Sequence, residues 1–170
     1  RVKRAFAAEA ADAVARAAEI VAGSFRNGGR VLLFGNGGSA SDAQHLAAEW
    51  CGRLSRERAA LPALALTANT SDLTALGNDY GFDRVFARLV EAHGRAGDVA
   101  IAISTSGNSP NVLAAVVAAR AGGLHTIALA GRDGGKLAPL VDLALVVPSD
   151  DTQRIQESHI AIGHALVELV

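Results

Sequence analysis

A run of hydroxyl side chains gives the strongest chemical signal in this sequence. Ser104-Thr105-Ser106-Gly107-Asn108-Ser109 follows the apolar run 99–103 and precedes Pro110 and a helical pattern over 111–121. The order predicts a strand, a hydroxyl-rich loop and a helix N-terminus, where free N–H groups and the helix dipole attract anions. The loop contains no lysine, unlike the nucleotide-binding P-loop. We therefore expect it to bind the phosphate of a small phosphorylated ligand.

A glycine-rich loop follows an earlier predicted strand. Gly35-Asn36-Gly37-Gly38-Ser39-Ala40 comes after the run 31–34 and matches the loose dinucleotide pattern G-x-G-x-x-A. That interpretation requires an acidic residue at the end of the next strand, which instead ends at Leu66-Thr67. The glycines equally fit a tight turn of any function. They also fit a polar wall opposite 104–109, because open α/β sheets bind ligands at the carboxyl ends of their strands.

Two pairs of potential metal ligands lie on predicted helices. His45 and Glu49 are four residues apart and share a helix face, although such a pair is most often an ordinary surface contact. Gln156 and His164 are eight residues apart, about 80° around a helix axis, so they can face the same side. Together these nitrogen and oxygen ligands make an acceptable zinc site. A metal there would polarise a carbonyl while Glu49 or His164 moves protons.

The remaining pattern indicates the elements that position these residues. Strands are predicted at 31–34, 63–67, 99–104, 125–130 and 143–147, and helices at 3–27, 40–54, 70–76, 82–93, 111–121, 136–140 and 152–170. The segment 77–81, Gly-Asn-Asp-Tyr-Gly, is predicted to be a turn. The strands are continuous apolar runs separated by helices, which indicates a parallel sheet covered on both faces. We therefore predict one α/β domain over 1–170, a doubly wound five-stranded parallel sheet with extra N- and C-terminal helices.

Composition narrows the class of protein. The net charge of −1 speaks against general nucleic-acid binding, and no apolar stretch approaches the ~20 residues of a membrane helix. Cys51 is the only cysteine, so it cannot form an internal disulfide and a reducing compartment is expected. We expect Cys51 and Trp50 to be packing residues. His159 lies about 140° from His164 on a helix, so both cannot face one ligand.

The whole chain resembles the sugar isomerase (SIS) domain family, and within it the sedoheptulose-7-phosphate isomerases, also called phosphoheptose isomerases. The matching segments are GNGGSASDAQHLAAEW from Gly35, LGNDYGF from Leu76, ISTSGNSPN from Ile103 and DTQRIQESHIAIGH from Asp151. The STSGNS loop alone indicates only the wider family. Its combination with the four potential metal ligands is far more specific, and the resemblance implies a flavodoxin-like αβα sandwich.

The resemblance also implies a role for each site residue. Substrate phosphate would be held by Ser104, Thr105, Ser106 and Ser109, and the sugar would contact Asn36, Gly37, Gly38, Glu49, Asn78, Asp79 and Gln156. One zinc ion per subunit would be bound by His45, Glu49, Gln156 and His164, with Glu49 and His164 as the acid–base pair. Such enzymes are homotetramers with sites at subunit interfaces. They are expected in the cytoplasm, in bacterial heptose synthesis for lipopolysaccharide or other glycoconjugates.

The implied reaction converts sedoheptulose 7-phosphate, a ketose, to D-glycero-D-manno-heptose 7-phosphate through an enediolate. It requires a base near C1 and stabilisation of an oxyanion, roles that suit Glu49 and the metal. One alternative is a non-catalytic relative that binds the replication initiator DnaA, which the retained ligand set argues against. Another is a sugar-phosphate-sensing module of a transcription factor, although these residues contain no DNA-binding segment. An isomerase of another ketose phosphate stays open, because sugar length is read by pocket shape.

Overall fold

A parallel β-sheet forms the centre of the computed structural model, which describes residues 2–170, with side chains described from Ala10 onward. Within that range the strands are β1 (Val31–Gly35), β2 (Ala63–Ala65), β3 (Val99–Ser104), β4 (His125–Gly131) and β5 (Leu143–Val147), in the sheet order β2-β1-β3-β4-β5. Every neighbouring pair is parallel. All residues of β1 and β3 are buried, which explains their continuous apolar runs. The predicted doubly wound α/β class is confirmed.

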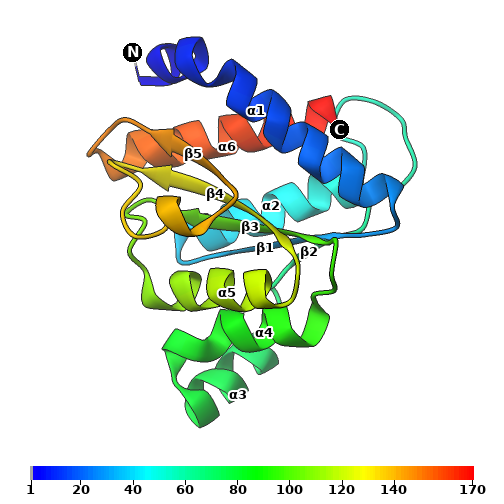
Figure 1. The fold of residues 1–170 in the computed structure, drawn as a ribbon, viewed down its shortest axis with the longest axis vertical. Helices are drawn as coiled ribbons and strands as arrows, with labels where there is room; N and C mark the ends of the chain where they lie inside the picture. Colours follow the sequence, from blue (N-terminus) through cyan, green and yellow to red (C-terminus); the bar gives the residue numbers. More distant parts are fainter. Residues whose placement is uncertain (1) are drawn as a thin grey trace.

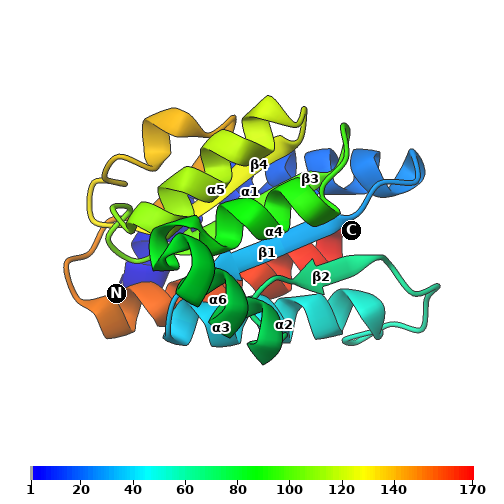
Figure 2. The ribbon, with the colours of Figure 1, turned by 90° about the horizontal axis from the view of Figure 1, so that it is seen from below.

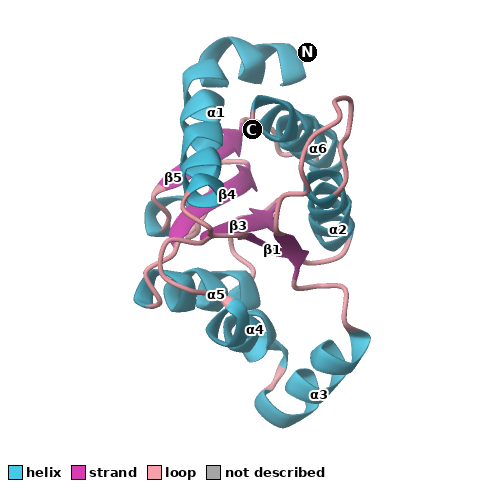
Figure 3. Cartoon of the chain, turned by 90° about the vertical axis from the view of Figure 1, so that its right-hand side faces the viewer, coloured by secondary structure: helices cyan, strands magenta, loops and turns pink. Residues whose placement is uncertain are grey.

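Helices cover both faces of the sheet (Figures 1 and 3). One face carries α1 (Val2–Arg26), α2 (Gly38–Cys51) and α6 (Thr152–Leu169), and the other carries α4 (Val85–His93) and α5 (Pro110–Ala121). Figure 2 looks onto the face covered by α4 and α5. Alternate strand residues enter different cores: Leu33 packs with the first group of helices and Leu32 with the second. No helix within residues 2–170 combines the length and apolarity that crossing a membrane requires.

The helix α3 (Thr70–Tyr80) stands away from the sheet, below α4 in Figure 1. The turn predicted at 77–81 is wrong, because α3 continues through Asn78 and Asp79. The side chain of Asn69 caps this helix by accepting from the N–H groups of Ser71 and Asp72. The cap and the packing of α3 on α4 override the local turn preference of Gly-Asn-Asp. A short 3₁₀ helix, η1 (Phe82–Arg84), then leads into α4, and a second, η2 (Ala138–Leu140), precedes β5.

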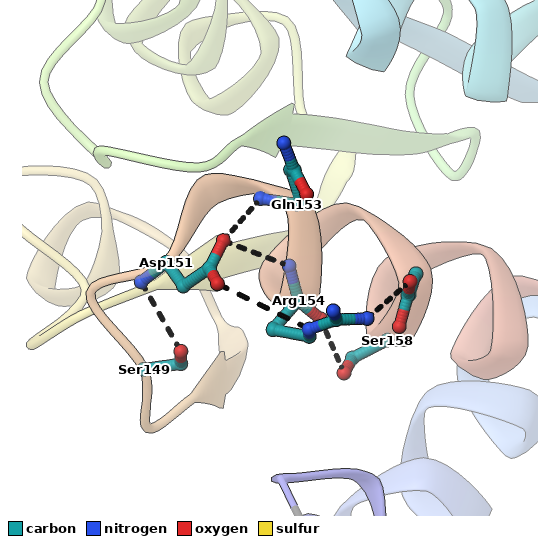
Figure 4. Close-up of polar contacts among 6 residues, drawn as sticks. Ser149, Asp151, Gln153, Arg154 and Ser158 are labelled. Carbon is teal, nitrogen blue, oxygen red and sulfur yellow. Dashed lines mark hydrogen bonds and ion pairs between the residues drawn. The ribbon is translucent and has the colours of Figure 1, made fainter.

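The start of α6 is fixed by polar contacts (Figure 4). The carboxylate of Asp151 accepts from the N–H groups of Gln153 and Arg154, and Asp151 N–H donates to Ser149 Oγ at 3.2 Å. Ser158 Oγ donates to the Arg154 carbonyl at 2.8 Å. A side-chain cap of this kind satisfies N–H groups that the helix itself leaves free. The cap therefore sets where α6 begins. Because the helical repeat is fixed, it also sets the side of α6 on which Gln156 and His164 lie.

Trp50 and Cys51 at the end of α2 have different environments. Trp50 is fully buried and packs edge-on against Phe25, with ring centroids 6.3 Å apart, so its predicted packing role is confirmed. Cys51 is exposed, and the same prediction for it is wrong. Consecutive helix residues point about 100° apart, so the helix face that buries Trp50 turns Cys51 outward.

Candidate functional site

The two predicted loops meet at one edge of the sheet. Gly35, the last residue of β1, pairs with Ile103 of β3, so the loops 35–40 and 104–109 leave adjacent strands. The winding direction of the sheet reverses between β1 and β3, because β2 lies to one side of this pair and β4 to the other. Open α/β sheets bind ligands in the crevice at such a switch point. The structure therefore places both loops where a ligand is expected.

The hydroxyl-rich loop presents its side chains at the start of α5. Ser104 Oγ accepts from Gly107 N–H at 3.2 Å and lies 3.3 Å from Ser109 Oγ. Ser109 is the N-cap residue of α5, yet its hydroxyl makes no capping hydrogen bond in the described structure. Pro110 has no N–H, and the N–H groups of Val112 and Leu113 donate to the Ser109 carbonyl, which leaves the Asn111 N–H for a ligand. This arrangement suits an anion that accepts from hydroxyls and backbone N–H groups together.

Gly107 allows the hydroxyl-rich loop to pack closely against the segment that follows β4. Gly107 has φ +64, and a Cβ there would lie 2.1 Å from the carbonyl oxygen of Gly134. The carbonyl of Gly107 also accepts from Leu137 N–H at 2.9 Å, and Asn108 Oδ1 accepts from Lys136 N–H at 3.1 Å. Only glycine fits this close approach without moving the backbone. The loop is thus held by its neighbours before any ligand binds.

The glycine-rich loop is tied to the start of α5 and lies under α6. Asn36 Nδ2 donates to Asn111 Oδ1 and Asn111 Nδ2 donates to Asn36 Oδ1, both at 2.9 Å. The amide of Gln156 lies over Gly38, where a Cβ would come within 2.4 Å of Gln156 Nε2. The strand β2 ends at Ala65 without an acidic side chain that could bind a ribose. These contacts favour the polar-wall interpretation of this loop over the dinucleotide one.

Two histidines from different helices face each other. His45 Nε2 on α2 lies 3.0 Å from His164 Nε2 on α6, and the ring centroids are 5.0 Å apart. Glu49 Oε1 lies 3.4 Å from the same His45 nitrogen. Two imidazole nitrogens bound to a tetrahedral zinc at about 2.0–2.1 Å lie about 3.3 Å apart. The spacing of this histidine pair therefore fits two ligands of such an ion.

The four expected ligands do not form one cluster, because Gln156 lies apart from the other three. In the part of the chain that the structure describes, no group of three or more His, Cys, Asp or Glu side chains is arranged to hold a metal ion. Gln156 lies against Gly38, and eight residues of helix separate it from His164, about 12 Å along the axis. His45 thus contacts both Glu49 and His164, whereas Gln156 lies beside the glycine-rich loop. The four-residue zinc site stays a prediction.

Asp42 is a further acidic residue near the histidine pair, and the sequence pattern did not single it out. It lies one helical turn before His45, and its Oδ2 atom is buried with no hydrogen-bond partner among the described residues. Burial raises the pKa of Asp42, while the nearby imidazoles of His45 and His164 act to lower it. The only signal in the sequence was the three-residue spacing from His45. A partly buried carboxyl group thus lies near the two imidazoles.

Asn78 and Asp79 are exposed on α3, where Asn78 Nδ2 donates to Asp79 Oδ1 at 2.9 Å. Within the described residues α3 packs on α4 and η1, and no hydrogen bond links these two side chains to either loop. Their predicted contact with the sugar is therefore not visible in a single chain. His159, by contrast, is fully buried, and its Nε2 contacts the Ala130 carbonyl at 3.0 Å, away from His164 as its helical angle predicts.

The fold and the paired loops define a sugar isomerase domain, and the model of the SIS domain family matches residues 1–131. The phosphoheptose isomerase of Rhodospirillum rubrum is 59% identical over 162 residues, covering 95% of this chain and 86% of that protein. The phosphoheptose isomerase structures from Neisseria gonorrhoeae and Francisella tularensis are 50% and 40% identical, with TM-scores of 0.94 and 0.95. Each comparison covers 99% of this chain and 90% of the other.

This chain belongs to the phosphoheptose isomerase family of SIS-domain proteins. The family and the fold predicted from its four sequence segments are confirmed.

Proposed function

We propose that this protein is an aldose–ketose isomerase that converts sedoheptulose 7-phosphate to D-glycero-D-manno-heptose 7-phosphate. Its relatives over nearly the whole chain are phosphoheptose isomerases. The observation that carries the proposal is the position of the hydroxyl-rich loop at the switch point of the sheet, beside the loop that leads into α2, the helix that bears His45 and Glu49. A phosphate anchor and a proton-transfer group are the two parts that this reaction needs.

The phosphate of the sugar binds to the hydroxyls of Ser104, Thr105, Ser106 and Ser109 and to the N–H group of Asn111 at the start of α5. Ser104 Oγ accepts from Gly107 N–H and lies 3.3 Å from Ser109 Oγ, so its O–H can turn from that hydroxyl to a phosphate oxygen when substrate binds. Asn36, Gly37 and Gly38 form the opposite wall and contact the sugar. Anchoring both ends of the substrate fixes the orientation of C1 and C2, which lowers the entropic part of the barrier.

Proton transfer is the task of Glu49 and His164. The Glu49 carboxylate takes the proton from C1, the electron pair of the broken C–H bond forms the double bond of the enediolate between C1 and C2, and the π pair of the C2 carbonyl moves onto O2. A proton then returns to C2 while the hydroxyl proton leaves O1, so the carbonyl moves to C1 with no net gain or loss of atoms. His164 carries protons between the two oxygens.

Zinc fits the donor types of this site, because the facing nitrogens of His45 and His164 have the spacing of two zinc ligands and Glu49 lies beside them. We assign His45, Glu49, Gln156 and His164 as the ligands of one zinc ion per subunit. When bound, the ion supplies stabilisation of the negative charge that develops on the sugar oxygens.

We also propose an oligomeric state and a cellular role for this protein. Four copies of the chain form a homotetramer whose subunits complete each other's sites, which would bring Asn78 and Asp79 of the projecting α3 to a substrate. Exposed apolar side chains such as Leu169 and Phe82 provide surface for such contacts. The enzyme works in the cytoplasm, in heptose synthesis for lipopolysaccharide or another glycoconjugate, and binds neither nucleic acid nor membranes.

The direct test is to mix purified protein with sedoheptulose 7-phosphate, with and without zinc, and to follow the aldose product. Turnover that zinc increases is the expected result. A six-carbon ketose phosphate in a parallel reaction tests the alternative substrate. Absence of turnover with every sugar and metal condition would overturn the proposal and favour a non-catalytic relative.

A further inference from the structure

A closed pair of amides joins the two loops of the site. Asn36 belongs to the loop after β1, and Asn111 lies in the first turn of α5, two residues after Ser109 of the phosphate loop. Each side chain donates Nδ2–H to the Oδ1 of the other at 2.9 Å, across 75 positions of sequence. Asn111 is 2% exposed and Asn36 is half-buried, so the pair lies largely within the protein.

The position of Asn111 is unfavourable for an asparagine unless the pair forms. A buried amide without partners loses the hydrogen bonds that water would give it. Asn111 is not the cap of α5, since Ser109 holds that position. Among the described residues its side chain bonds only to Asn36. The contact that accounts for a buried amide at this position is therefore its double hydrogen bond to Asn36.

We propose that Asn111 is a positioning residue that fixes Asn36 and so sets the distance between the phosphate loop and the wall that contacts the sugar. This inference rests on the proposed function, because the distance matters only if one substrate touches both loops. The sheet fixes the two strands, but the loops beyond them are held to each other by this pair. Loosening it leaves the phosphate anchored while C1 and C2 lose their fixed orientation.

The variant N111D tests the pair through its pH profile. An ionised carboxylate offers only acceptors, so it keeps the bond from Asn36 Nδ2 but faces Asn36 Oδ1 with a second oxygen. A protonated carboxyl donates its O–H to Asn36 Oδ1 and accepts from Nδ2, which restores the closed pair in the same shape. Burial raises the pKa of an introduced carboxyl, so this protonation occurs under mildly acidic conditions.

Two readouts are compared with wild type at each pH. We expect the kcat/KM of N111D to be about tenfold or more below wild type near pH 8 and to approach wild type near about pH 5.5, with most of the loss in kcat. The side-chain NH₂ signal of Asn36 in NMR should be protected from solvent exchange in wild type, lose protection in N111D near pH 8 and regain it on acidification. N111L, of similar size but apolar, should show a loss that does not recover, and N27D, at the exposed end of α1, should match wild type throughout.

The outcomes separate the inference from the proposed function. N111D activity equal to wild type at every pH, or a loss as independent of pH as that of N111L, would overturn the positioning role. Wild-type protein without isomerase activity would refute the proposed function. The NMR signal of Asn36 would then still decide whether Asn111 holds that side chain, since it requires no substrate.

Discussion

His45 and His164 stand 119 positions apart in the sequence and present their Nε2 atoms to each other at 3.0 Å. At this distance the two Nε2 atoms are close enough to share one hydrogen bond, in which one ring donates and the other accepts. Glu49 Oε1 approaches the same His45 nitrogen at 3.4 Å, and the buried carboxylate oxygen of Asp42 lies nearby on α2. The pair is therefore the place where the proposed zinc ion would meet its two nitrogen ligands.

Replacing His164 with glutamine should lower zinc affinity by more than about 100-fold, since changes to residues that only orient a ligand already cost about 10–100-fold. The measurement is competition against a chromophoric chelator, with the zinc content per chain determined after dialysis. The exchange His125→Gln, at the exposed start of β4, is the matched control. Equal zinc affinity in the His164 variant and wild type would remove His164 from the ligand set.

Glu49→Gln should reduce turnover by about 10²–10⁴, the usual effect of removing a general acid or base. The exchange keeps the size of the side chain and an oxygen ligand but removes the base. Solvent deuterium should then stop entering C1 of the ketose in the zinc-loaded variant. Glu57→Gln, an exposed glutamate beyond the end of α2, is the control. Deuterium incorporation at the wild-type rate would show that another group is the base.

Removing two hydroxyls of the phosphate loop, Ser104→Ala with Ser106→Ala, should weaken substrate binding by about 1.5–3 kcal/mol for each charge-assisted hydrogen bond lost. Substrate affinity is measured by calorimetric titration of the variant with a sugar phosphate. A circular dichroism melt checks the fold, because Ser104 Oγ also accepts from Gly107 N–H. Ser41→Ala on the exposed side of α2 should bind normally. Unchanged affinity in the double variant would place the phosphate elsewhere.

Burial lowers the pKa of His159, and its contact with the Ala130 carbonyl only partly opposes this. An unfolded histidine has a pKa of about 6.5, so below that pH the unfolded chain takes up a proton that folded His159 refuses. The free energy of unfolding should therefore fall as pH decreases from about 6.5 toward the lowered pKa of the folded state. His159→Gln keeps a donor for Ala130 and cannot titrate. Urea titrations should give it a shallower pH dependence, and parallel curves for both proteins would contradict this.

Light scattering at micromolar concentration should report about four chains per particle. The apolar surface at the end of α6, including Leu169, is expected to lie in a subunit contact. Leu169→Glu should therefore shift the protein toward smaller species, whereas Leu64→Glu at the edge strand β2 serves as an exposed apolar control. A monomeric wild-type protein would refute the tetramer.

The local sequence pattern determined the strands, the hydroxyl-rich loop and the helix face that carries His45 and Glu49. The strands at 99–104 and 143–147 have the predicted bounds. A short continuous apolar run is typical of a strand in a parallel sheet whose faces are covered by helices. The hydroxyl-rich loop was visible as a loop between a strand and a helix, and the face shared by His45 and Glu49 follows from the helical repeat. These features depend on residues a few positions apart, which is the range over which sequence patterns carry information.

Only the tertiary structure decided which distant side chains meet. The order β2-β1-β3 puts the loops of Asn36 and Asn111 side by side, and the packing of α2 on α6 brings His45 to His164. The extension of α3 through Asn78 depends likewise on its packing against α4. No local preference encodes these contacts, because they arise from burying helix faces against a sheet whose strand order is a property of the whole chain.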